Sequence, residues 1–161
     1  MQKFLLTAAT VLVALTGIVY AVFKYLGDSL ATRWPSLFSG ADDPFSAVHH
    51  PLEPWSLDLH VLAAPVLVFA FGWIFKDHIL AKLSAAGVPA RRSGVLGVIL
   101  FVPMVVSGYL LQVVTSEALH GPLVVLHLAS GALFAGTYAV HLLLAPKRPR
   151  NGGGLGAARL R

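Results

Sequence analysis

Histidines are the residues of this chain whose type and spacing could do chemistry, and seven occur among its 161 residues. His127 and His141 lie 14 residues apart. In one helix they would share a face, about 21 Å apart along the axis. His60 and His78 lie 18 residues apart, which is five whole turns, so they would share a face at about 27 Å. Neutral imidazole is a common metal ligand, so both pairs are candidate ligands.

The surroundings of these histidines are strongly apolar. Hydrophobic residues make up 57% of the chain and charged residues 12%, whereas a soluble domain carries about 25% charged residues. Too little polar surface remains to cover a water-soluble globule. The chain has no cysteine, which excludes disulfides, iron–sulfur ligation, thioether-attached haem and cysteine nucleophiles. The composition therefore predicts an integral membrane protein in contact with the lipid bilayer.

Four apolar stretches are long enough to cross a membrane, since a hydrocarbon core of about 30 Å needs about 20 apolar residues in a helix. The sequence predicts an all-α four-helix bundle over residues 1–146 and a basic, Gly/Arg-rich cytoplasmic tail over 147–161. The predicted spans are about 4–26, 59–80, 94–114 and 122–145, with an outer loop over 27–58. The first span exceeds a signal-peptide core and is interpreted as a retained anchor. No internal repeat stands out.

The basic residues predict the orientation of the spans. Lys24 and Arg33 fall on one side of the predicted membrane, and the other ten basic residues fall on the opposite side. Basic residues mark the cytoplasmic side, so both termini are expected to be cytoplasmic in a bacterial-type inner membrane. As topology signals, they give no reason to expect nucleic acid as a partner. The ten are Lys3, Lys76, Lys82, Arg91, Arg92, Lys147, Arg148, Arg150, Arg159 and Arg161.

The second and fourth spans run in the same direction, which places the histidines at two levels. His60 and His127 lie toward the outside, and His78 and His141 lie toward the inside. Ionisable residues within a membrane usually face the bundle interior and mark functional sites. The arrangement predicts two haem b groups, each with an imidazole on both axial faces. The distance along the helix from His60 to His78 is about 6 Å longer than that from His127 to His141. Helix tilt or a bend at Pro65 must compensate for this difference.

Four other residues leave alternatives open. His120 precedes His127 by seven residues, lies almost on the same face, and is a rival outer ligand. His49 and His50, in the outer loop, could cap the outer haem or line a quinol pocket, or could serve no site. Gly131, four residues after His127, would leave room for a porphyrin edge, although small residues are ordinary at membrane helix contacts.

The fourth span also carries a resemblance. The segment 126–144, LHLASGALFAGTYAVHLLL, resembles the histidine-bearing helices of the di-haem cytochrome b superfamily. That superfamily includes the respiratory cytochrome b core and the cytochrome b subunits of formate dehydrogenases and hydrogenases. Its members place histidine pairs about four turns apart on membrane helices. The specific likeness is confined to His127, Gly131 and His141.

The second span departs from this pattern, because Ile74 occupies the position 14 residues after His60. His78 is the expected substitute ligand. The resemblance implies electron transfer between a quinone in the bilayer and a redox partner, with the chain acting as one subunit of a larger electron-transfer complex rather than as a stand-alone enzyme.

Basic residues near the span ends are expected to pair with haem propionates. Arg33 is the outer candidate. A haem-free scaffold or assembly subunit is the rival function. A transition-metal carrier is disfavoured because the histidines lie at two depths, and a hydrolase because there is no H-E-x-x-H motif. The inner propionate candidates are Lys76, Lys82, Arg91, Arg92 and Lys147.

Overall fold

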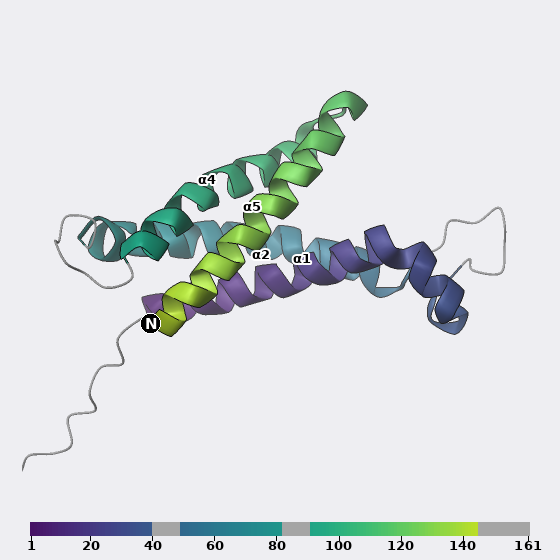
Figure 1. Ribbon diagram of the computed structural model, residues 1–161, viewed down its shortest axis with the longest axis horizontal. Coiled ribbons are helices and arrows are strands. Elements are labelled where there is room, and N and C mark those ends of the chain that lie inside the picture. The colour runs from purple at the N-terminus through teal and green to yellow at the C-terminus, as the bar shows by residue number, and fades with distance from the viewer. Residues whose placement is uncertain (40–48, 82–90, 145–161) are drawn as a thin grey trace, which may run out of the picture.

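The computed structural model describes residues 1–39, 49–81 and 91–144, without the side chains of 77–79, 91 and 92. The described residues confirm the predicted all-α fold, with four long helices (Figure 1). The elements are α1 (Gln2–Arg33), a short 3-10 helix η1 (Pro35–Leu37), α2 (Leu52–Ile74), its π-helical continuation η2 (Phe75–Leu80), α4 (Arg91–Val113) and α5 (Glu117–Leu144).

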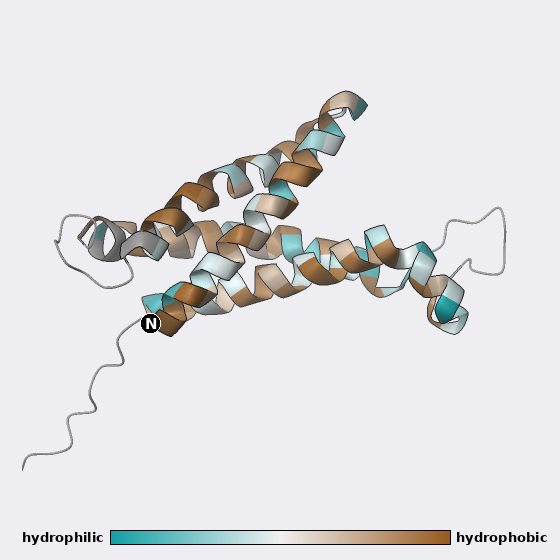
Figure 2. Ribbon diagram, in the orientation of Figure 1, coloured by the Kyte–Doolittle hydropathy of each residue, from teal (hydrophilic) through white to brown (hydrophobic). Residues whose placement is uncertain are grey.

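All four long helices are apolar enough to cross a membrane, and Figure 2 shows apolar residues along most of their length. All four helices extend beyond the predicted spans, α4 by only three residues at its start. Helix α1 continues to Arg33, while α2 begins at Leu52 and α5 at Glu117. The predicted outer loop over 27–58 therefore begins and ends in helix. The predicted tail over 147–161 lies outside the described residues.

Proline determines where α1 ends. Trp34 has φ −137° and ψ 67°, outside the helical region, and Pro35 follows it. A proline ring clashes with a helical residue before it, which pushes that residue toward extended backbone. Apolar run length locates only the part of a helix that lies in hydrocarbon, and so it misses an end set by backbone chemistry.

The four long helices form two antiparallel hairpins. Helix α1 packs along α2, and α4 packs along α5 (Figure 1). Between the hairpins, the ring of Phe71 in α2 stacks on that of Phe101 in α4, with centroids 3.8 Å apart. Thr7 Oγ1 of α1 lies in hydrogen-bond contact with the Tyr138 hydroxyl of α5, at 2.9 Å. Lipid is as apolar as leucine, so close packing and polar contacts of this kind associate helices in a membrane.

An aromatic layer fills the middle of the bundle. Phe134 is only 3% exposed and lies seven residues from both His127 and His141. Its ring centroid is 5.5 Å from that of Phe101 and 6.1 Å from that of Tyr138. The two histidine levels of α5 are thus separated by packed side chains.

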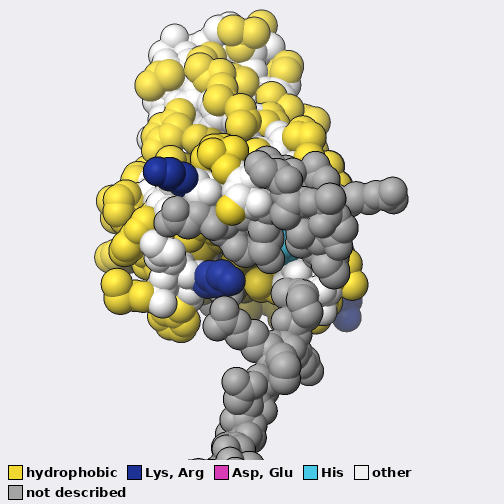
Figure 3. Space-filling model, turned by 90° about the vertical axis from the view of Figure 1, so that its left-hand side faces the viewer, with side chains coloured by type: hydrophobic (Ala, Val, Ile, Leu, Met, Phe, Trp, Pro, Cys, Tyr) yellow, Lys and Arg dark blue, Asp and Glu magenta, His cyan; other side chains and the backbone are white. Residues whose placement is uncertain are grey.

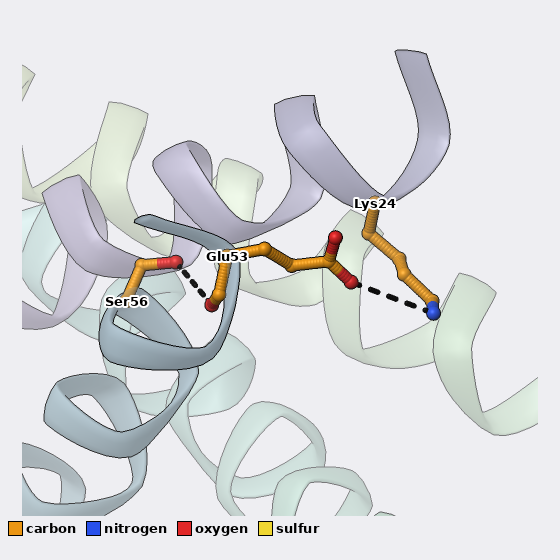
Figure 4. A network of polar contacts seen from close by, with 3 residues as sticks. All are labelled: Lys24, Glu53 and Ser56. Carbon is orange, nitrogen blue, oxygen red and sulfur yellow. Dashed lines mark hydrogen bonds and ion pairs between the residues drawn. The ribbon is translucent and has the colours of Figure 1, made fainter. Parts of the chain in front are cut away.

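A polar contact joins the end of α1 to the start of α2 in the first hairpin. Lys24 Nζ of α1 lies 3.5 Å from a Glu53 carboxylate oxygen of α2. Ser56 Oγ donates to the Glu53 carbonyl oxygen at 2.8 Å (Figure 4). The lysine is half exposed, and ion pairs of this kind contribute little to stability. The contact links the last turns of α1 to the first turn of α2.

Candidate functional site

The structure brings His60 and His127 together from different hairpins. Their ring centroids are 6.0 Å apart and their planes are inclined by 88°. Two imidazoles on opposite sides of one metal ion need a metal–nitrogen bond of about 2 Å on each side, which with the half-width of each ring puts the centroids about 6 Å apart. The observed separation therefore suits two axial ligands of one iron.

The first hairpin fixes the tautomer of His60. Its Nδ1 lies 2.9 Å from the Val13 carbonyl oxygen and 3.4 Å from Thr16 Oγ1. The Thr16 hydroxyl donates its own hydrogen to the Leu12 carbonyl at 2.8 Å. A carbonyl oxygen can only accept, so the hydrogen of the neutral ring is on Nδ1. Nε2 keeps its lone pair and is the nitrogen available to a metal.

His127 makes the same kind of contact within the second hairpin. Its Nδ1–H donates to the Met104 carbonyl oxygen at 2.9 Å and lies 3.3 Å from Ser107 Oγ. The fully buried Ser107 hydroxyl donates to the Pro103 carbonyl at 2.6 Å. Metal-bound histidines commonly donate their other ring N–H to a carbonyl, which fixes the ring orientation. Both rings already have that partner.

Two glycines make room for the rings. A Cβ atom at Gly17 would lie 2.9 Å from Cε1 of His60, and a Cβ at Gly108 would lie 2.8 Å from Cε1 of His127. Each glycine stands four residues after the carbonyl that its histidine uses. Residues four apart lie on one helix face, with the later Cβ tilted back toward the earlier residue. A glycine at the later position therefore leaves the carbonyl open to a second donor.

The two histidine environments form an internal repeat. In each hairpin the first helix supplies a carbonyl, then a hydroxyl three residues later and a glycine four residues later, and the second helix supplies the histidine. We call this set the carbonyl–hydroxyl–glycine motif. The expectation that no internal repeat stands out holds only for the linear sequence. The two sets are Val13, Thr16 and Gly17 with His60, and Met104, Ser107 and Gly108 with His127.

His141 is held by the last two members of the same motif. Its Nδ1 lies 3.2 Å from Ser93 Oγ, and a Cβ at Gly94 would lie 3.6 Å from its Cε1. These two residues precede the corresponding pair on α4 by 14 positions, just as His141 follows His127 by 14. The antiparallel register of α4 and α5 therefore places a serine and a glycine of α4 beside each of the two histidines.

The first hairpin has no matching second histidine in that register. Ile74, which is buried, occupies the position 14 residues after His60. The predicted ligand His78 lies four residues further on, in η2. Its side chain is outside the described ones, so its pairing with His141 stays a prediction. Single π-helical turns occur frequently at functional sites.

His50 makes structural contacts just before the start of α2. Its ring stacks on Phe23 with centroids 3.9 Å apart and planes inclined by 4°, and it meets Phe38 edge-on at 5.2 Å. Its Nδ1 accepts a hydrogen bond from the Leu52 backbone N–H at 3.1 Å. Because the first N–H groups of a helix have no partner within it, this contact caps the start of α2.

His49 and His120 do not take part in the ring pair. His49 is exposed, and its backbone exchanges two hydrogen bonds with Ser39, at 3.0 and 3.2 Å. His120 is exposed near the start of α5. Of the two rival outer ligands on α5, the structure places the deeper one, His127, against His60.

The remaining predicted site residues have other neighbours. Gly131 lies beside Met104, whose Cγ would be 3.9 Å from an added Cβ, and its place at a porphyrin edge stays a prediction. The Arg33 guanidinium lies 5.7 Å from the Trp34 ring centroid, and Lys76 is exposed. Four predicted propionate partners lie outside the described side chains: Lys82, Arg91, Arg92 and Lys147.

The donor set of the pair suits haem better than a bare metal ion. Among the described residues, no three His, Cys, Asp or Glu side chains gather where they could hold a metal ion. Two imidazoles would leave a bare zinc ion, which is bound by three or four protein ligands, incompletely bound. A porphyrin supplies the remaining nitrogens itself, so two axial imidazoles suffice.

Comparisons of the chain with protein-family models, with curated proteins and with solved structures found no match. The site is therefore interpreted from its geometry. The described residues define a four-helix protein with four candidate membrane spans and a histidine pair between its two hairpins.

Proposed function

We propose that this protein is a membrane b-type cytochrome, a subunit that passes electrons across the bilayer between a quinone pool and a redox partner. One observation carries the proposal: the ring centroids of His60 and His127, which come from different hairpins, lie 6.0 Å apart with their planes inclined by 88°. Haem, when bound, would supply the one-electron chemistry. The protein's residues would bind and orient it and exclude water.

The chain would contribute the Nε2 atoms of His60 and His127, whose rings are already held by other groups. Each Nδ1–H donates to a backbone carbonyl of the neighbouring helix at 2.9 Å, which directs the Nε2 lone pair of His60 and of His127 away from that helix. Such a second hydrogen bond also raises the basicity of a ligand imidazole. Helix backbone is rigid, so little reorganisation would accompany electron transfer.

We further propose a second haem at the inner level. His141 lies beside Ser93 and Gly94, which correspond to the hydroxyl and glycine positions beside His127. His78 remains its proposed partner. The two levels lie about 21 Å apart along α5, and the aromatic layer around Phe134 separates them. Two haems at these depths would carry electrons through the bilayer.

The haem proposal is tested on protein purified from haem-replete cells. We expect a reduced-minus-oxidised spectrum of the b type. We also expect acidified acetone to extract the pigment and denaturing gels to show no haem stain, because the chain has no cysteine to form a thioether. A colourless preparation would favour the rival function, a haem-free scaffold or assembly subunit.

We also propose that both termini are cytoplasmic and that the membrane is of the bacterial inner type. Ten of twelve basic residues fall on that side. Figure 3, which views the bundle end that carries the N-terminus, shows Lys and Arg side chains and, among the described residues in that view, no acidic ones. Reporter fusions after Lys82 and at the C-terminus should be active only as cytoplasmic reporters. Activity of a periplasmic reporter at either site would contradict the orientation.

A further inference from the structure

We propose that the hydroxyl groups of Thr16 and Ser107 set the reduction potential of the haem held by His60 and His127. The proposal rests on the proposed function, since it concerns the haem that those histidines would bind. Thr16 and Ser107 are positioning residues in this scheme, because they touch the ligand imidazoles and not the iron.

The direction of the hydroxyl hydrogens carries the argument. Thr16 donates to the Leu12 carbonyl at 2.8 Å and Ser107 to the Pro103 carbonyl at 2.6 Å. The nearest alternative acceptors are also carbonyls of the same helices, at 3.2 and 3.1 Å. In either orientation, the hydroxyl hydrogen points into its own helix. The oxygen lone pairs then face the ligand Nδ1–H, at 3.4 Å for His60 and 3.3 Å for His127.

Each ligand N–H therefore lies between two acceptors, a near carbonyl and a more distant hydroxyl. Acceptors at Nδ1–H increase the electron donation of the imidazole to the metal. Greater donation stabilises ferric over ferrous iron and lowers the reduction potential. The effect of each acceptor is strengthened in an interior of low dielectric constant, and Ser107 is fully buried.

Ordinary helix chemistry explains the carbonyl contact but not the histidine contact. Serine and threonine often bond back to the carbonyl four residues earlier, and Thr10 and Ser130 do so at 2.8 and 2.6 Å. Both are buried, and no contact between them and a ligand Nδ1 is described. Thr16 and Ser107 differ in facing a ligand ring, and they do so at the same position of the motif in both hairpins. Thr10 and Ser130 are therefore matched controls.

The test is a potentiometric titration of the purified holoprotein. Thr16→Val and Ser107→Ala should each retain haem and raise the midpoint of one redox transition. The reduction equilibrium should change by up to about tenfold, equivalent to 59 mV for one electron. Thr10→Val and Ser130→Ala should leave that midpoint unchanged. Thr16→Ser, which keeps the hydroxyl, should restore the wild-type value.

The outcomes separate this inference from the proposed function. If Thr16→Val and Ser107→Ala retain haem but shift the midpoint no more than their controls, the inference is wrong and the cytochrome proposal stands. Loss of haem from both variants, with both controls holding it, would also overturn the inference, because the hydroxyls would then be needed for binding. A wild-type protein without haem would overturn both proposals.

Discussion

Replacing either His60 or His127 by alanine should remove the same haem. The two rings lie 6.0 Å apart and would share one iron, so the loss of either leaves the iron with a single axial imidazole. The double variant should lose no more than each single variant, because residues that act as a unit are not additive. The expected result is that the same one of two redox transitions disappears from a potentiometric titration of all three variants.

Two other histidines provide the controls. His120→Ala should keep both transitions, since that side chain is exposed at the start of α5. His141→Ala should remove only the other transition, because about 21 Å of helix separates it from His127. If His60→Ala and His127→Ala abolished different transitions, the ring pair would not be one site. If His120→Ala cost the outer haem, the outer ligand would be misassigned.

Gly17→Ala and Gly108→Ala should each weaken haem binding strongly. A Cβ atom would stand 2.9 or 2.8 Å from Cε1 of the ligand ring, closer than carbon atoms can approach, and the ring is tied to a backbone carbonyl on the same helix. The histidine ring would therefore have to move toward the proposed haem. Changes to the partners of a ligand typically cost about 10–100-fold in affinity. Haem retained per protein after purification, and titration of haem-depleted protein with haem, measure the loss.

Gly97→Ala is the matched control, because it lies on α4 like Gly108 but an added Cβ would meet nothing within 4 Å. Alanine is favoured over glycine within a helix by about 1 kcal/mol, so helix propensity predicts the opposite effect at all three positions. Equal haem affinity in Gly108→Ala and Gly97→Ala would mean that the ring tolerates displacement, and the role assigned to the glycines would be incorrect.

The sequence predicts the four helices and the outer histidine pair for identifiable physical reasons. Long apolar runs are required by the thickness of a bilayer, and they can be counted. His60 and His127 could be paired because both lie at the outer ends of spans that run in the same direction. That pairing requires only a count of the membrane crossings between the two histidines.

The environment of the His60 ring could not be predicted in the same way. Val13, Thr16 and Gly17 lie on a helix without a histidine, and their side chains are common in membrane helices. Hydroxyl–glycine steps also occur elsewhere, as at Ser130 and Gly131. A hydroxyl–glycine step can be recognised as part of a histidine environment only when the register of the two antiparallel helices is known, and the three-dimensional structure supplies that register. Gly131 lies beside Met104, and its place at a porphyrin edge stays a prediction.

The division of the ligands between two hairpins has a consequence for biosynthesis. Each hairpin satisfies its backbone hydrogen bonds within its own helices, as a membrane requires, and the long helices pack mainly within their own hairpin. The first hairpin can therefore enter the bilayer before the second is translated. His60 meets His127 only once the hairpins associate, so capture of haem would be the final event of assembly. A ligand that binds only the associated state shifts the equilibrium toward that state by mass action, so haem bound as proposed would stabilise the association of the two hairpins.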